Sequence, residues 1–328
     1  MTQPSSTPAR WPWTLIRILL SMLLLIWVLH ATPLETIVAG LRQASPGLLV
    51  IGMLLGVAAR FAAAERTQCI SRALGLSVTR AQTLEALFIS NFYALLSPGP
   101  VLSGVVTVYR YRSYGASMTG SVTSLLASRA IEVATFIALG TSCLLLDPAV
   151  MLASVRVPLL IAAATLAVLG VGALGWYVLH RRRAPDEAPQ QSGGDAAGGM
   201  LARLRAVHAE VMRRGPAMAL QAALPASAQV ILSGAAVAML AQSLGFDLAL
   251  VTAIWISAAV YAAVLLPISV AGLGVREVTL LKSLALLSVP PNLSVALSVL
   301  MFADPVLNAL IGGVVQFVSA ARQRAASA

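Results

Sequence analysis

Long apolar runs, separated by short basic segments, dominate this chain. Several of these runs have the length of roughly 20 residues that a helix needs to cross a hydrocarbon core of about 30 Å. They cover residues 14–29, 46–64, 118–146, 157–179, 217–240, 248–266 and 294–318. The pattern predicts an all-α polytopic membrane protein with about six full spans. It is not typical of a transmembrane barrel, whose strands alternate over about ten residues.

The composition supports a membrane protein and excludes several other classes. Hydrophobic residues make up 59% of the chain and charged residues only 10%, too few to cover the surface of a soluble globular domain. The net charge is +10, but the basic residues are spread over the segments between the apolar runs. They do not form one basic cluster with interleaved aromatic residues, so nucleic-acid binding is not expected. The two cysteines are far apart and without metal-ligand spacing, so we expect no disulfide framework, no metal site and no cofactor.

The basic segments also predict the topology. Positive residues collect at the N-terminus, in a predicted loop with Arg66, Arg72 and Arg80, in "HRRR" and in "AARQR". Because cytoplasmic loops are enriched in Lys and Arg, we expect a multi-pass protein of the plasma (inner) membrane with both termini in the cytoplasm. A cleaved signal peptide is the alternative for residues 14–29. Residues 1–328 form one predicted transmembrane domain, in which a flexible cytoplasmic linker, residues 181–214, joins an N-terminal half, residues 1–180, to a C-terminal half, residues 215–328.

Two apolar segments contain similar interruptions. Residues 95–111 read "LLSPGPVLSGVVTVYRY" and residues 265–281 read "LLPISVAGLGVREVTLL". The breaks fall at Pro98, Gly99, Pro267, Gly272 and Gly274. Paired Gly/Pro-interrupted segments predict two broken, re-entrant helical hairpins in an inverted-repeat arrangement around a polar cavity. The alternative is that both segments are ordinary spans with kinks.

Charged residues inside the apolar runs are the candidate binding residues. Arg129 and Glu132 lie three positions apart, so they share a helix face and can form an ion pair. The adjacent Arg276 and Glu277 are expected to find different partners, and we hypothesise an ion pair between Arg276 and Glu132. Because arginine suits phosphate, the predicted head-group site consists of Arg110, Arg112, Arg129, Glu132, Arg276 and Glu277. A purely structural ion pair at residues 129 and 132, and a plain basic loop at 110–112, are the alternatives.

The motif "LPISVAGLGVRE" and the upstream arrangement "NFYALLSPG…VYRYRSYG…SRAIEV" resemble the flippase-like transmembrane domain of lysylphosphatidylglycerol synthases and their stand-alone relatives. The chain departs from the family pattern where Glu132 replaces the usual Asp, where Ala271 replaces a glycine and where an upstream acidic residue is missing. The resemblance implies a protein that handles polar-headed lipids. It also implies that the soluble synthase domain of the full-length enzymes is absent, so we expect no enzyme activity.

We therefore expect a flippase or transporter that moves an anionic polar-headed lipid between leaflets. By the resemblance, a phospholipid, a hopanoid or a polyprenyl-linked glycolipid are candidate substrates, and lipid or glycolipid biosynthetic enzymes are possible partners. The alternative is a non-transporting membrane scaffold or an accessory subunit of such an enzyme.

Overall fold

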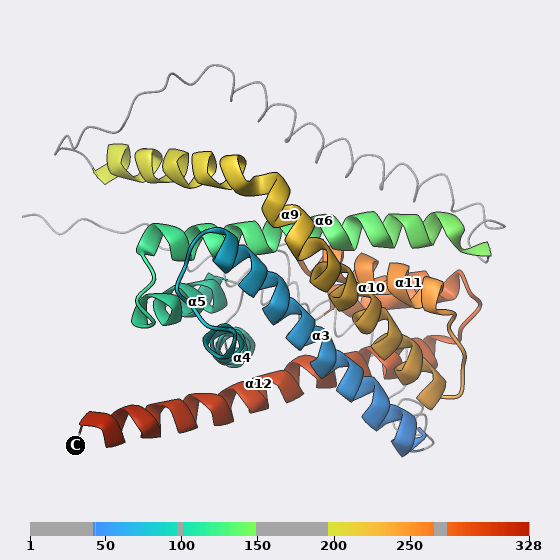
Figure 1. Ribbon diagram of the computed structural model, residues 1–328. Coiled ribbons are helices and arrows are strands. Elements are labelled where there is room, and N and C mark those ends of the chain that lie inside the picture. The colour runs from blue at the N-terminus through green and yellow to red at the C-terminus, as the bar shows by residue number, and fades with distance from the viewer. Residues whose placement is uncertain (1–41, 43, 97–100, 149–195, 266–273, 328) are drawn as a thin grey trace, which may run out of the picture.

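The computed structural model describes residues 42, 44–96, 101–148, 196–265 and 274–327. All regular structure in these ranges is helical, which confirms the predicted all-α class (Figure 1). The main helices are α3 (Pro46–Ala73), α4 (Arg80–Leu96), α5 (Val101–Ser113), α6 (Met118–Leu146), α9 (Ala196–Ser243), α10 (Leu250–Leu265), α11 (Val275–Ala285) and α12 (Pro291–Ser327). Helix α9 begins inside the range 181–214 that the sequence predicts as a linker, and residues 181–195 lie outside the described residues.

Four of the described helices are long and apolar enough to cross a membrane, which makes this a multi-pass membrane protein. They cover Pro46–Ala73, Met118–Leu146, Ala219–Ser243 and Pro291–Ala321, and the shorter apolar helix Leu250–Leu265 accompanies them. Large apolar side chains on these helices point outward; Leu224 and Phe317, for example, are 80% and 77% exposed. Lipid can solvate such side chains at no hydrophobic cost. The predicted runs 14–29 and 157–179 lie outside the described residues.

Each predicted break separates two short helices. The first lies between α4 and α5, and the second between α10 and α11. Ser90 of α4 hydrogen-bonds Thr107 of α5 at 2.7 Å, and Tyr111 donates to Thr83 at 3.4 Å. The earlier residue of α4, Thr83, contacts the later residue of α5, Tyr111, and Ser90 contacts the earlier Thr107. The two helices therefore pack antiparallel, as a hairpin. Of the break residues, Pro98, Gly99, Pro267 and Gly272 lie outside the described residues.

Gly274 is the break residue that the structure describes. Its φ of +82° and ψ of −51° lie in a region that side-chain-bearing residues rarely adopt, so this position requires glycine. Its N–H donates to the Glu277 carboxylate at 2.6 Å, which caps the first turn of α11. The second break therefore ends in a defined helix start.

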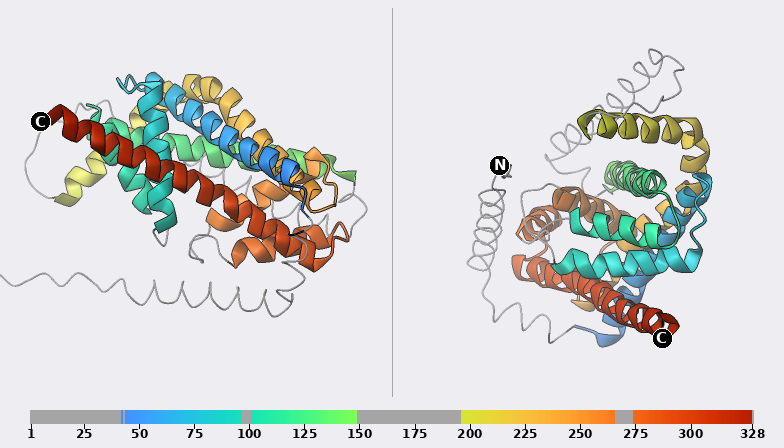
Figure 2. Two further views of the ribbon diagram at one scale, coloured as in Figure 1. Left: turned by 90° about the horizontal axis from the view of Figure 1, so that it is seen from below. Right: turned by 90° about the vertical axis from the view of Figure 1, so that its left-hand side faces the viewer.

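Helices α3 and α9 form the central pair of the fold and run side by side (Figures 1 and 2). Their antiparallel orientation follows from contacts at both ends: Ser45 N–H donates to the Ser243 carbonyl at 2.9 Å, while Arg66 hydrogen-bonds Gln229. Between these points, Leu240 of α9 packs directly against Gly52 of α3. A Cβ added at Gly52 would lie only 2.9 Å from a Leu240 methyl carbon.

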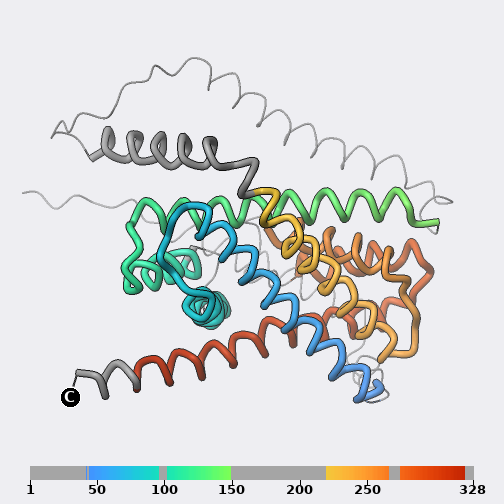
Figure 3. The backbone as a smooth tube through the Cα atoms, in the orientation of Figure 1, coloured from blue at the N-terminus to red at the C-terminus, as the bar shows by residue number. Residues whose placement is uncertain are grey.

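The remaining long helices each pack on the helix that precedes a break. Helix α6 packs on α10, and α12 packs on α4. Both contacts depend on a glycine, because a Cβ added at Gly140 would overlap Ala258 and one added at Gly312 would overlap the carbonyl oxygen of Phe88. The tube in Figure 3 shows that α6 and α12 run in opposite directions.

Four helices end in the same turn. At the ends of α3, α5, α9 and α11, the N–H of a residue with positive φ donates to the carbonyl oxygen of the residue three positions earlier. The N–H of the following residue donates to the carbonyl oxygen five positions before itself. The four positive-φ residues are Gly75, Gly115, Gly245 and Ser288. This double hydrogen bond satisfies the last carbonyls of each helix.

Candidate functional site

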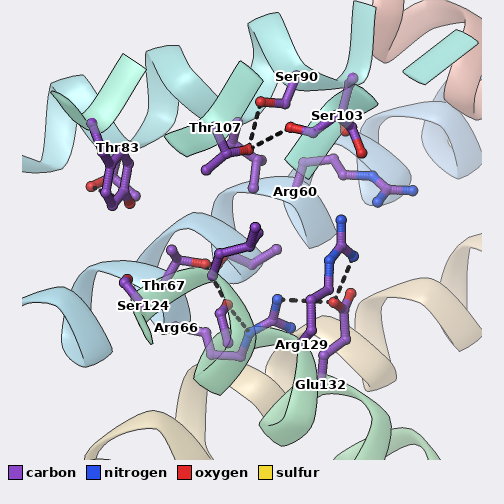
Figure 4. A pocket seen from close by; sticks show the side chains of 16 residues that line it. Arg60, Arg66, Thr67, Thr83, Ser90, Ser103, Thr107, Ser124, Arg129 and Glu132 are labelled. Carbon is purple, nitrogen blue, oxygen red and sulfur yellow. Dashed lines mark hydrogen bonds and ion pairs between the residues drawn. The ribbon is translucent and has the colours of Figure 1, made fainter. Parts of the chain in front are cut away.

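A polar pocket lies between α3, α4, α5 and α6. It opens to the outside, and the space in it that the centre of a water-sized molecule can occupy is about 70 Å³. Figure 4 shows the side chains that line it. Most of its lining carries a charge, a hydroxyl group or an amide: Arg60, Arg66, Thr67, Thr83, Ser90, Asn91, Ser103, Thr107, Tyr111, Ser124, Ser128, Arg129 and Glu132. Two of the four helices, α3 and α6, are long enough to span a membrane, so the pocket brings polar groups to transmembrane helices.

Glu132 of α6 accepts hydrogen bonds and ion pairs from three helices. Arg129 Nη1 lies 2.9 Å from Glu132 Oε2, which confirms the predicted pair within α6. Arg66 Nη2 of α3 lies 3.3 Å from the same oxygen, and Gln229 Nε2 of α9 donates to Oε1 at 2.9 Å. Figure 4 shows Arg66 and Arg129 meeting at this carboxylate. Glu132 therefore joins both halves of the chain.

Arg66 is buried, with only 4% of its side chain exposed. The prediction that places it in a cytoplasmic loop is wrong, because α3 continues through Arg66 to Ala73. Its Nε donates to Ser128 at 3.3 Å, and Ser128 lies 2.8 Å from Thr67, whose hydroxyl donates to the Ala63 carbonyl. These polar partners, together with Glu132, make a buried cation tolerable inside a transmembrane helix.

A second arginine of α3 reaches the C-terminal half. Arg60 Nη2 lies 3.2 Å from Asp304 Oδ2 of α12. Asn308 donates to the other oxygen of the carboxylate at 3.0 Å, and Gly56 of α3 leaves the space that the carboxylate occupies. Sequence analysis does not select Arg60, Arg66, Gln229 or Asp304 as site residues. A usable sequence feature was present, because Arg60 interrupts an apolar run and Asp304 lies within another.

Arg276 and Glu277 form a separate buried cluster. The hypothesised Arg276–Glu132 pair is wrong, and so is the expectation of different partners, because Arg276 Nη2 lies 2.6 Å from Glu277 Oε1. Glu277 folds back to cap α11, which places its carboxylate where the long arginine side chain can reach it. Ser298 of α12 hydrogen-bonds both residues, at 3.1 Å and 2.9 Å, and the Arg276 guanidinium lies 4.9 Å from the centre of the Phe302 ring.

The two remaining candidates lie on α5 and do not line the pocket. Arg110 is buried, lies 3.7 Å from Glu85 of α4 and hydrogen-bonds Gln316 of α12. Arg112 is exposed. The structure therefore brings Arg129 and Glu132 into the pocket and distributes the other four predicted residues elsewhere. Among the described residues, no group of three His, Cys, Asp or Glu side chains could hold a metal ion.

Comparison with known proteins agrees with the membrane architecture. Residues 14–312 match the family described as "Lysylphosphatidylglycerol synthase TM region". The match includes α3–α6 and the second half as far as residue 312, so both the pocket and the Arg276 cluster lie within it. A search of curated protein sequences gives no match.

Proposed function

Since this chain belongs to the family of lysylphosphatidylglycerol synthase TM regions, we propose that it moves an anionic polar-headed lipid between membrane leaflets. The observation that carries the proposal is the pocket lined by three arginines, Arg60, Arg66 and Arg129, on transmembrane helices. Charged side chains at membrane depth are costly and by default serve a function. The three guanidinium groups outnumber the two carboxylates that they contact, Glu132 and Asp304, which favours an anion. Guanidinium also binds phosphate in a bidentate fashion.

The packing of the helices supports an inverted repeat. In the proposed correspondence, α3, α4, α5 and α6 match α9, α10, α11 and α12. The matching pairs then make the same kinds of contact: α6 packs on α10 as α12 packs on α4, and each contact is made at a glycine, Gly140 or Gly312. The four identical turns end helices that correspond to each other. Because α3 and α9 are antiparallel, the halves would have opposite orientations.

The two corresponding long helices, α6 and α12, also make similar hydrogen bonds near their C-terminal ends. Asp147, at the end of α6, accepts from Trp255 of α10 at 2.7 Å and from Thr252 at 2.6 Å. Near the end of α12, Ser319 donates to Glu85 of α4 at 2.7 Å. Each long helix is thus hydrogen-bonded to the first helix of the other half's hairpin. Transporters built from inverted repeats alternate access by rocking one half against the other around a central site.

In this proposal the lipid head group enters the pocket from one leaflet while the acyl chains stay in the bilayer. The protein acts without chemical conversion of the lipid and is not an enzyme. We place it in the plasma (inner) membrane with both termini in the cytoplasm. Biosynthetic enzymes of the lipid are its proposed partners, because they would supply the substrate on one side.

Leaflet exchange in proteoliposomes tests the proposal. Head-group-labelled anionic and zwitterionic lipids with the same tails are incorporated, and a membrane-impermeant quencher reports the labelled lipid in the outer leaflet. We expect the wild-type protein to expose the inner-leaflet anionic probe, and Arg129→Gln to slow the exchange. Arg72→Gln is the matched control, because Arg72 is exposed and lies outside the pocket. A folded wild-type protein that exchanges neither probe would refute transport and favour the scaffold or accessory role.

A further inference from the structure

The hydroxyl groups and arginines of the pocket mostly satisfy one another. Thr107 donates to the Ser103 carbonyl at 2.9 Å, so in its 2.7 Å contact with Ser90 it is the acceptor. In the same way, Thr83 accepts from Tyr111 and donates to Gln68. Such closed networks bind helices together and leave few donors for a ligand.

Two buried donors at the pocket are exceptions. Within the described residues of the chain, Arg60 Nε and Asn91 Nδ2 are buried and have no hydrogen-bond partner. Both residues line the pocket, Arg60 from α3 and Asn91 from α4. The two helices touch nearby, because the rings of Phe61 and Phe88 lie 5.9 Å apart. Buried polar atoms are nearly always paired, so two unpaired donors at one pocket call for an acceptor.

The far end of Arg60 is held weakly. Its ion pair with Asp304 has an N–O distance of 3.2 Å, and 35% of the Arg60 side chain and 18% of the Asp304 side chain are exposed. Partly exposed pairs of this kind contribute little to stability. Asp304 also keeps a second partner, Asn308, which donates to its other oxygen. The carboxylate can therefore lose Arg60 without being left unpaired.

Arg66, unlike Arg60, has no unpaired nitrogen and no exposed ion pair. Its Nε donates to Ser128, its two other nitrogens reach Gln229 and Glu132, and its side chain is 4% exposed. Every nitrogen of this guanidinium is engaged within the protein. A ligand could reach Arg66 only by displacing a buried carboxylate, which is far more costly than displacing Asp304 from Arg60.

We propose that Arg60 and Asn91 form the contact for a phosphate oxygen of the lipid head group, and that Asp304 is the carboxylate this phosphate displaces from Arg60. The inference rests on the proposed function and places the head group at the part of the pocket that α3 and α4 line. Head-group binding would then release the link between α3 and α12, since that ion pair joins those two helices. Arg66 and Glu132 would remain a structural pair.

Equilibrium binding of a fluorescent phosphodiester lipid to the full chain in detergent micelles tests this assignment. We expect Arg60→Gln to weaken binding about tenfold or more, because a charge-assisted hydrogen bond is lost, and Asn91→Ala to weaken it as well. Asp304→Asn removes the competing carboxylate and should tighten binding about two- to fivefold. The double variant Arg60→Gln/Asp304→Asn should bind like Arg60→Gln alone, since Asp304 acts through Arg60. Arg72→Gln is the control and should bind like the wild type.

Each other outcome contradicts a stated element of the account. If the wild type binds the lipid and both Arg60→Gln and Asn91→Ala bind equally well, the assignment is overturned while the proposed function stands. If the wild type binds neither a phosphodiester lipid nor a zwitterionic one, the proposed function fails. Inorganic phosphate that displaces the lipid at equal concentration would show that the site takes free phosphate and would refute the lipid assignment.

Discussion

Replacing Glu132 with glutamine should cause a large loss of stability, because it leaves Arg66 as a buried cation without a carboxylate. The carboxylate receives Arg66 at 3.3 Å, Arg129 at 2.9 Å and Gln229 at 2.9 Å. The side chains of Glu132 and Arg66 are 5% and 4% exposed, so solvent cannot replace the lost partner. Breaking a buried pair by removing one member typically costs about 3–5 kcal/mol, and we expect Glu132→Gln to lower the free energy of unfolding by about that amount.

Two matched variants make the prediction specific. Arg129→Gln removes a cation whose side chain is 54% exposed and leaves Glu132 with Arg66, so it should cost less than about 1 kcal/mol. The double variant Arg66→Met/Glu132→Leu removes both buried charges and should regain most of the lost stability, since an apolar pair of similar volume is often neutral relative to a buried ion pair.

Reversible unfolding of the purified protein in mixed micelles, followed by far-UV circular dichroism as the fraction of denaturing detergent rises, provides the measurement. Equal losses for Glu132→Gln and Arg129→Gln would refute the reasoning, because the two sites differ mainly in burial. A double variant that is less stable than Glu132→Gln would also refute the reasoning. The double variant contains no buried charge without a partner, so the cause proposed for the loss in Glu132→Gln would be absent from it.

Three further substitutions test other regions of the structure by thermal unfolding in detergent. Gly312→Ala should cost about 1–3 kcal/mol because the new methyl group overlaps a backbone carbonyl of α4, whereas Gly47→Ala, which meets open space, should be nearly neutral. Asp147→Ala should cost about 1–3 kcal/mol because the buried indole N–H of Trp255 loses its acceptor, and Asp147→Asn should restore some of that. Arg276→Met should cost about 3–5 kcal/mol because it leaves the buried Glu277 carboxylate without a cation, and a loss below about 1 kcal/mol would contradict the ion pair.

Much of the helical architecture could be predicted from the sequence. Four of the apolar runs correspond to helices long enough to span a membrane, and each break lies between two short helices, because apolar run length and Gly/Pro interruptions act locally. The Arg129–Glu132 pair was predictable for the same reason, since residues three positions apart in a helix share a face.

The composition of the site could not be predicted, because it depends on contacts between distant segments. Arg66 was expected in a loop because it follows an apolar run, but the helix continues beyond it and buries it against α6 and α9. The adjacency of Arg276 and Glu277 suggested different partners. The Glu277 carboxylate accepts from the Gly274 N–H at the start of α11, and this places it within reach of the Arg276 guanidinium.

Competition for leaflet exchange tests the central claim most directly. Exchange of the labelled anionic lipid by wild-type protein is measured in vesicles that contain increasing amounts of unlabelled anionic or zwitterionic lipid. If the arginine-lined pocket carries the head group, exchange should saturate, and the anionic competitor should suppress it at concentrations where the zwitterionic one does not. Exchange that does not saturate and that both competitors leave unchanged would show lipid movement without a head-group site and would contradict the account.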